Sequence, residues 1–371
     1  MQQQQHPLLS ASPGTTREII SYHFGAGSSR QVYIQAGLHG DELPGVTVAW
    51  YLKKKFAGLE AASRLQAEIT LVPVANPLAL GQHWHGTHLG RFDTASGQDF
   101  NRQFPALGPA LATRLADVLT DDVEQNRQHI RRAIAAYFDH HLPRTELESQ
   151  RHTLMRMACQ ADLMIDLHCD WEAIAHLYTT PQAWPEIEPL ARYLGSEVQL
   201  TAEISGGEPF DEACCEPWLH LQRTLGSRFP LPPGLKPVTL ELRGVRDVSH
   251  SQAEDDAEAI VNALIYSGYI SGPCHAIPEL RNPAVPLAAC EYISAPHSGV
   301  ILHCREPGEW IKPGEVVAEI LDPTTDRLTP LKAEHGGLLY ARHWMRFATA
   351  GMLITRLAGS GTIREGNLLV P

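Results

Sequence analysis

The sequence has little charge and few aromatic side chains, and its basic residues are outnumbered by acidic ones. Only 19% of its 371 residues are charged and 7% are aromatic, while 43% are hydrophobic. This composition is typical of a folded globular protein and excludes a disordered or fibrous chain. Thirty Lys and Arg stand against 42 Asp and Glu, which gives a formal net charge of −12. Such a charge repels phosphate backbones and anionic lipid surfaces, so we expect neither nucleic acid nor a membrane as a partner.

The sequence also lacks the signals of a secreted or membrane-inserted chain. No apolar run approaches the roughly 20 residues of a membrane-spanning helix. The opening MQQQQHP has neither the basic end nor the apolar stretch of a signal peptide. The seven cysteines are odd in number and form no CxxC pair of zinc-finger or thioredoxin type. We therefore expect a cytoplasmic protein whose cysteines are reduced thiols. The sequence leaves open whether the chain forms a homo-oligomer.

Residues 1–14 are polar and end in Ser-Pro-Gly, which predicts a disordered lead-in. From there to about residue 270, short β-rich runs alternate with longer helical periods. This alternation predicts an α/β sandwich around a largely parallel or mixed sheet. The expected strands are 18–24, 31–36, 69–74, 163–167 and 238–242, and the expected helices are 43–56, 109–119, 123–138, 146–160 and 253–267.

Beyond about residue 270 the helical periods stop, and short strands with frequent Gly and Pro follow. This change predicts a second, small all-β domain. We place the division so that residues 15–285 form the α/β domain and residues 286–371 the all-β, barrel-like domain.

Histidine is abundant, with 19 residues, which directs attention to a metal or proton-transfer site. The strongest local pattern is AGLHGDE (36–42), directly after an expected strand and at the start of an expected helix. Ligands of open α/β sheets bind at the carboxyl ends of strands, so His39 and Glu42 could supply two ligands to Zn²⁺ there. The spacing alone also fits chance, because His303 and Glu306 share it in the all-β region.

A catalytic zinc takes three protein ligands and leaves one position for water. His168 closes the apolar run LMIDL (163–167), which would place it at the end of a neighbouring strand. A histidine in that place could equally be a hydrogen-bonded structural residue. Asp166 precedes it by two positions on the same strand face, where it would either orient His168 or be a buried hydrogen-bonded carboxylate.

Glu241 interrupts the apolar strand pattern PVTLEL (237–242). Burial of an unpaired carboxylate costs several kcal/mol, which favours a functional role over a salt bridge to Arg243 or a solvent-facing position. In the segment DFNRQF (99–104), the adjacent Asn101 and Arg102 could hold a carboxylate through an amide donor and a planar fork. The ordinary explanation of such a pair is a surface arginine.

Together these residues resemble the zinc carboxypeptidase superfamily, and specifically its succinylglutamate desuccinylase/aspartoacylase family, over roughly residues 17–270. The segments that carry the resemblance occur in the order HGDE (39–42), NP (76–77), Arg91, DFNR (99–102), His168 and Glu241. The resemblance implies a three-layer α/β/α sandwich with a mixed sheet, and it makes residues 15–285 a zinc hydrolase catalytic domain.

The resemblance also implies the roles of the site residues and one Zn²⁺ per chain. Those roles are metal ligation by His39, Glu42 and His168, general base and acid catalysis by Glu241, carbonyl polarisation by Arg91, and a clamp on a substrate carboxylate by Asn101 and Arg102. The implied activity is removal of an acyl group from an N-acyl amino acid or a related small carboxylate. A metallocarboxypeptidase on short peptides and a non-catalytic metal- or ligand-binding relative are the alternatives.

The all-β domain resembles the biotinyl/lipoyl-like barrel, because APHSG (295–299) matches the opening of its first half. True carriers present a modified lysine in a hairpin turn, whereas the turn here, DPTTDR (322–327), has none and Lys332 lies further on. We therefore expect a packing or active-site-rim role rather than carrier function. The histidines His83, His85 and His88 are assigned a loop or substrate-rim role.

Overall fold

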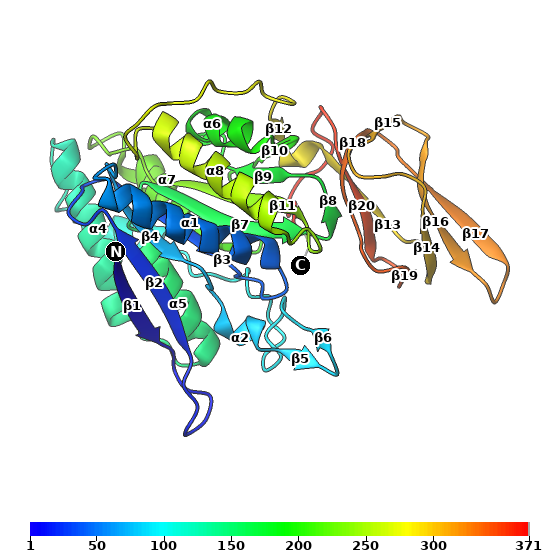
Figure 1. Cartoon of the computed structure of the whole chain (residues 1–371), viewed down its shortest axis with the longest axis horizontal. Coiled ribbons are helices and arrows are strands. Elements are labelled where there is room, and N and C mark those ends of the chain that lie inside the picture. The colour runs from blue at the N-terminus through cyan, green and yellow to red at the C-terminus, as the bar shows by residue number, and fades with distance from the viewer. Residues whose placement is uncertain (370–371) are drawn as a thin grey trace.

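The computed structural model describes residues 1–369, and its largest element is a nine-stranded mixed sheet (Figure 1). In spatial order its strands are β1 (Gln2–Pro7), β2 (Glu18–Phe24), β4 (Glu68–Val72), β3 (Gln31–Ala36), β7 (Leu163–Asp170), β11 (Lys236–Gly244), β9 (His176–Thr179), β10 (Val198–Thr201) and β12 (Val285–Pro286).

The centre of this sheet is parallel, because β4, β3, β7 and β11 run in one direction. β9 pairs antiparallel with β11, and β10 and β12 continue parallel to β9. All eight residues of β7 are buried, as expected for a strand covered by helices on both faces. The carboxyl ends of β3 and β7 therefore meet at one edge of the sheet, where the candidate site lies.

Helices cover both faces of the sheet and complete a three-layer α/β/α sandwich (Figure 1). One face packs against α1 (Leu43–Ala61), α6 (Trp184–Leu194) and α8 (His250–Tyr266). The other packs against α3 (Gly108–Leu115), α4 (Val123–His140), α5 (Glu146–Ala158) and α7 (Phe210–Leu225). The predicted fold class is thus confirmed. Within residues 1–369, no helix has the length and apolar character needed to cross a bilayer.

The expected disorder of residues 1–14 is wrong for Gln2–Pro7. These residues form β1, which pairs antiparallel with β2 from Gln2 opposite His23 to Pro7 opposite Glu18. The glutamine side chains are mostly exposed, so the strand is held by its backbone hydrogen bonds and not by an apolar pattern. A composition-based prediction cannot detect such a strand, because its stability depends on the neighbouring edge.

The sequence prediction also missed α6, α7, β9, β10 and β12. Both helices contain an internal proline, Pro189 in α6 and Pro217 in α7, and proline is a strong signal against a helix interior. The strands are four residues long or shorter, so they have too few positions to show an alternating pattern.

The C-terminal strands form a small all-β domain of two sheets, as predicted, with its own apolar core. One sheet contains β13 (Cys290–Ser294), β20 (Leu353–Ala358), β18 (Gly337–Arg342) and β15 (Trp310–Ile311). The other contains β17 (Arg327–Lys332), β16 (Val316–Asp322), β14 (Gly299–His303) and β19 (Phe347–Ala348). The short strand β8 (Glu172–Ala173), which follows β7, pairs with β18 and so joins the two domains. The predicted domain boundary at residue 285 falls inside β12 (Val285–Pro286), which belongs to the large sheet. The boundary stays a prediction.

Candidate active site

His39 and Glu42 lie in the short connection between β3 and α1. Gly37 has a φ of +70°, a conformation that L side chains adopt at a cost, and it turns the chain out of the sheet. A Cβ atom on Gly40 would lie 2.4 Å from the backbone of Ala79, so only glycine allows this close approach. Glu42 is the residue before the first turn of α1. The local backbone therefore directs the His39 and Glu42 side chains to the same point.

Glu42 bridges the two histidines of the candidate site. Its Oε1 lies 2.8 Å from His39 Nδ1, and its Oε2 lies 2.7 Å from His168 Nδ1. All three residues are buried, and one ligand atom from each lies within 4.8 Å of the others. Two imidazoles and one carboxylate are the ligand set of catalytic zinc sites that keep a position open for water. The residues present therefore fit Zn²⁺.

The same three groups shift one another's proton affinity. Burial disfavours the charged form of each imidazole, but nearby carboxylates outweigh it, so the pKa of His39 is raised and that of His168 is raised further. Burial would also raise the pKa of Glu42, but the two imidazoles hold it well below its usual range. The cluster thus keeps Glu42 as a carboxylate, which is the form that binds a metal.

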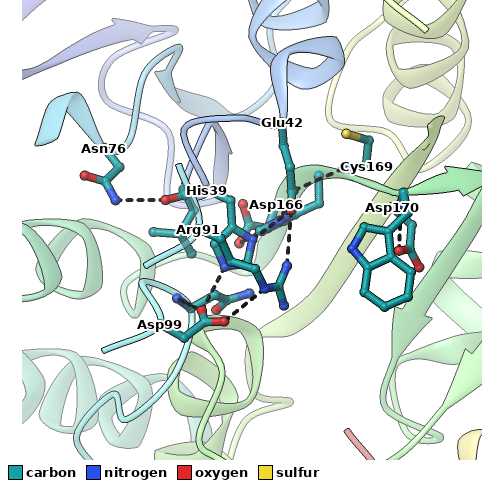
Figure 2. A network of polar contacts seen from close by, with 12 residues as sticks. His39, Glu42, Asn76, Arg91, Asp99, Asp166, Cys169 and Asp170 are labelled. Atoms are coloured by element: carbon teal, nitrogen blue, oxygen red, sulfur yellow. Dashed lines mark hydrogen bonds and ion pairs between the residues drawn. The ribbon is translucent and has the colours of Figure 1, made fainter. Parts of the chain in front are cut away.

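Each histidine also contacts a second carboxylate through its other ring nitrogen. His39 Nε2 lies 2.8 Å from Asp99 Oδ1, and His168 Nε2 lies 3.0 Å from Asp166 Oδ2. Asp166 is fully buried, and its Oδ1 accepts a hydrogen bond of 3.0 Å from Gln35. Carboxylates in these places fix the orientation of a ligating imidazole. Asp166 is therefore a buried, hydrogen-bonded carboxylate that also contacts His168, so the two interpretations of it do not exclude each other (Figure 2).

Glu241 on β11 stands opposite His168 on β7 in the register of the two strands. Its Oε2 is buried and has no hydrogen-bond partner among residues 1–369. The alternative partner Arg243 is instead bound to Asp256, with Nη1 to Oδ1 at 3.1 Å. Burial, reinforced by the charges of Glu42 and Asp170, raises the pKa of Glu241 to about 8. A carboxyl group with such a pKa can both accept and return a proton near neutral pH.

Arg91 lies beside the bridging carboxylate. Its Nε is 3.2 Å from Asp99 Oδ2 and its Nη1 is 3.7 Å from Glu42 Oε1 (Figure 2). About a third of the side chain is exposed, at 32%. The guanidinium is thus held near the ligand cluster while part of it faces the pocket, a position from which it can reach a substrate oxygen.

Asn101 and Arg102 follow Asp99 on the same loop. The Oδ1 atom of Asn101 accepts the backbone N–H of Phe210 at 2.8 Å, which anchors the loop to the start of α7. Arg102 Nη1 donates to the Asn101 carbonyl oxygen at 2.7 Å. A Cβ atom on Gly207 would approach Arg102 Cδ to 2.8 Å, so the arginine packs on a glycine. These contacts occupy the amide oxygen of Asn101 and leave its Nδ2 donors for another acceptor.

All seven residues assigned from the sequence line one pocket, which the described side chains enclose at the carboxyl edge of the sheet. The prediction missed several other residues of its wall, among them Tyr178, Asp211, Glu212, Tyr292 and Arg356. It also missed Asp170, although Asp166, His168 and Asp170 alternate along β7 and so share one strand face. That alternation is a signal that could have identified it.

His83, His85 and His88, which the sequence predicted to lie in a loop, lie in an exposed hairpin. Its strands are β5 (His83–Trp84) and β6 (Thr87–His88). His83 and His88 stack with ring centroids 4.5 Å apart. Among the residues that line the pocket of the described chain, none comes from this hairpin. The predicted loop is thus a short β-hairpin that carries His83 and His88 on its two strands, and the rim role stays a prediction.

Residues 28–267 match the family model of the succinylglutamate desuccinylase/aspartoacylase catalytic domain. No curated protein matches the sequence. A succinylglutamate desuccinylase/aspartoacylase family protein from Shewanella amazonensis superposes with a TM-score of 0.83 at 25% identity, covering 96% of this chain and 98% of the other.

A more distant likeness shows the fold alone. The product-bound ectoine utilization protein EutE (DoeB) from Ruegeria pomeroyi has a TM-score of 0.68 at 15% identity, and the match covers 97% of this chain and 94% of that one. The likeness therefore extends over both domains of the chain.

Proposed function

Because the chain belongs to the succinylglutamate desuccinylase/aspartoacylase family, which consists of amide hydrolases, we propose that it is a zinc-dependent deacylase. Its substrate would be an N-acyl amino acid or a related small carboxylate. The observation that carries the proposal is the placement of Glu241. This carboxyl group, whose Oε2 is buried with no hydrogen-bond partner among residues 1–369, lies opposite His168 and lines the same pocket as His39, Glu42 and Arg102. A protein that only bound a metal would have no use for such a group.

In this proposal, His39, Glu42 and His168 hold one Zn²⁺. Bound there, the ion would supply Lewis-acid chemistry, lowering the pKa of a water and polarising the scissile carbonyl. Asp99 and Asp166 hold the two imidazoles in place through their second ring nitrogens.

Side chains around the three candidate zinc ligands carry out proton transfer, carbonyl polarisation and substrate binding. Glu241 accepts the proton of the attacking water and then delivers it to the leaving nitrogen, because expulsion of an unprotonated amide anion is prohibitively costly. Arg91 donates hydrogen bonds toward the carbonyl oxygen as negative charge develops on it. Arg102, together with the Nδ2 group of Asn101, holds the carboxylate of the amino-acid half through charge-assisted hydrogen bonds.

The test is a substrate panel with the zinc-loaded protein, in which released amine is measured for N-acyl amino acids and for dipeptides. The proposal expects turnover of N-acyl amino acids and its loss in Glu241→Gln at unchanged zinc content. Preferential release of C-terminal residues from dipeptides would assign the chain to the carboxypeptidases. No turnover of either class at full zinc occupancy would support a non-catalytic binding role.

A further inference from the structure

Part of the pocket wall is built by the C-terminal β domain. Tyr292 on β13 and Leu353 and Arg356 on β20 all line the pocket that holds the candidate zinc ligands. Two contacts hold this domain against the α/β domain near the end of β7. β8 pairs with β18, and the carboxylate of Glu172 on β8 binds Arg342 at 2.7 Å. This wall is therefore a fixed part of the site.

The polar centre of this wall is the ion pair of Asp170 and Arg356. Arg356 Nη1 bonds to Asp170 Oδ2, and Asp170 Oδ1 accepts the backbone N–H of Trp171 at 2.8 Å. The guanidinium lies 4.5 Å from the ring centroid of Trp171 and 5.6 Å from that of Tyr292. Only 15% of the Arg356 side chain and 7% of the Asp170 side chain is exposed. The charge of Arg356 is thus already balanced inside the protein.

The ion pair and the carboxylate clamp lie at different ends of the site. Figure 2 shows Asp99 and Asp170 on opposite sides of Glu42. The backbone N–H of Arg102 donates to the Asp99 carbonyl oxygen at 3.3 Å, which places the clamp at the Asp99 end. Asp170 follows His168 by two residues on β7 and marks the other end. A substrate amide between the two ends would point its amino-acid half toward Arg102 and its acyl half toward Arg356.

We propose that the Asp170–Arg356 end is the acyl subsite and that it selects uncharged acyl groups over acyl groups that carry a carboxylate. The inference rests on the proposed deacylase function and deepens it. An acyl carboxylate placed there would meet the Asp170 carboxylate and an arginine whose charge that carboxylate already balances. Like charges in a partly desolvated pocket repel, and loss of hydration adds to the cost. An uncharged chain would instead contact Tyr292 and Leu353, which gain from burial.

The test compares an N-butanoyl and an N-succinyl derivative of one amino acid, which share a four-carbon acyl chain and differ in its terminal carboxylate. The zinc-loaded wild type should hydrolyse the butanoyl compound with a kcat/KM at least about tenfold higher, a ratio that corresponds to 1.4 kcal/mol. Asp170→Asn leaves the Arg356 charge unbalanced and should shift the succinyl-to-butanoyl ratio toward succinyl by about tenfold or more. Because the readout is a ratio on one protein, altered zinc loading cancels.

Glu172→Gln is the matched control. It removes a carboxylate from the same interdomain contact, but Glu172 is not among the residues that line the pocket. The acyl ratio of this variant should equal that of the wild type. An equal shift in Glu172→Gln and Asp170→Asn would assign the effect to domain docking and overturn the proposal.

Product inhibition tests the subsite on the wild type alone, should Asp170→Asn fail to fold. Butyrate should inhibit hydrolysis of the butanoyl compound more strongly than succinate does. Succinyl preference in the wild type, an unchanged ratio in Asp170→Asn, or stronger inhibition by succinate would each refute the subsite while leaving the deacylase function standing. Absence of turnover of any acyl compound would instead refute the deacylase function, and the subsite with it.

Discussion

His39 and Asp99 are joined by a hydrogen bond of 2.8 Å between Nε2 and Oδ1, although 60 residues separate them in the sequence. The same carboxylate group lies 3.2 Å from Arg91 and accepts the backbone N–H of Asn101 at 2.7 Å. One side chain thus ties a candidate metal ligand to the candidate carbonyl-polarising arginine and to the start of the carboxylate clamp. Histidine orientation and substrate placement are therefore expected to change together when Asp99 is altered.

We expect Asp99→Asn to weaken zinc binding by about 10- to 100-fold, the scale found for residues that orient metal-ligating histidines. Competition with a chromophoric chelator measures the affinity. Asp93→Asn is the control, because Asp93 is buried in the same loop but bonds to Ser96, with Oδ2 to Oγ at 2.6 Å. Equal zinc affinity in the wild type and Asp99→Asn would contradict the orienting role.

Replacement of His39 or His168 by alanine removes a direct ligand, and two protein ligands hold zinc poorly. Elemental analysis of the purified variants should find substoichiometric zinc in both. His88→Ala, in the exposed β5–β6 hairpin, should retain the metal content of the wild type. Stoichiometric zinc in both ligand variants would refute the metal assignment.

Glu241→Gln keeps the size of the side chain but cannot accept the proton of the attacking water. Zinc content and thermal unfolding should match the wild type, while kcat falls by roughly two to four orders of magnitude, the range of general acid–base effects. Single-turnover measurements with the best N-acyl substrate test this. Near-normal turnover would exclude Glu241 as the proton-transfer residue.

Arg102→Lys keeps the charge of the clamp but loses its planar two-point fork. Hydrogen bonds to charged groups contribute roughly 1.5 to 3 kcal/mol, so kcat/KM should fall by about one to two orders of magnitude. The fall should nearly vanish when the substrate carboxylate is replaced by a neutral amide, because the wild type then has no carboxylate to hold. An equal loss on both substrates would mean that Arg102 supports the fold or the transition state.

His176 makes stability sensitive to acid. It is 2% exposed, and burial lowers its pKa to about 4 despite the nearby Asp170. The unfolded chain, with a histidine pKa of about 6.5, binds a proton that the folded chain does not. This site should therefore reduce the free energy of unfolding by roughly 1.4 kcal/mol per pH unit as pH falls from about 6.5 to about 4.

Urea unfolding of the chelator-treated protein at several pH values measures this slope without a contribution from zinc release. His176→Gln cannot titrate, so its stability should depend less steeply on pH than that of the wild type. Parallel curves for the two proteins would show that His176 is not the source of the acid sensitivity.

The candidate zinc ligands could be predicted from the sequence because each lies where a strand ends. The run before His168 and the turn that carries His39 and Glu42 are local patterns, and parallel strands bring their carboxyl ends to one edge. The role of Asp170 could not be predicted in this way, since its partner Arg356 is 186 positions away. β1 escaped prediction for a related reason, because only the edge of β2 gives it structure.

Because the chain is synthesised from its N-terminus, Asp170 and Arg356 are also separated in time during synthesis. At about 5 to 20 residues per second, a ribosome needs about 10 to 40 s to add the 186 positions between Asp170 and Arg356. By then all three candidate zinc ligands and Glu241 have been made, whereas β20 is the last strand of the described chain to appear. If the proposed function and subsite hold, a nascent chain can bind zinc before the β20 part of the pocket wall has been made, and acyl selectivity arises as the final step of maturation.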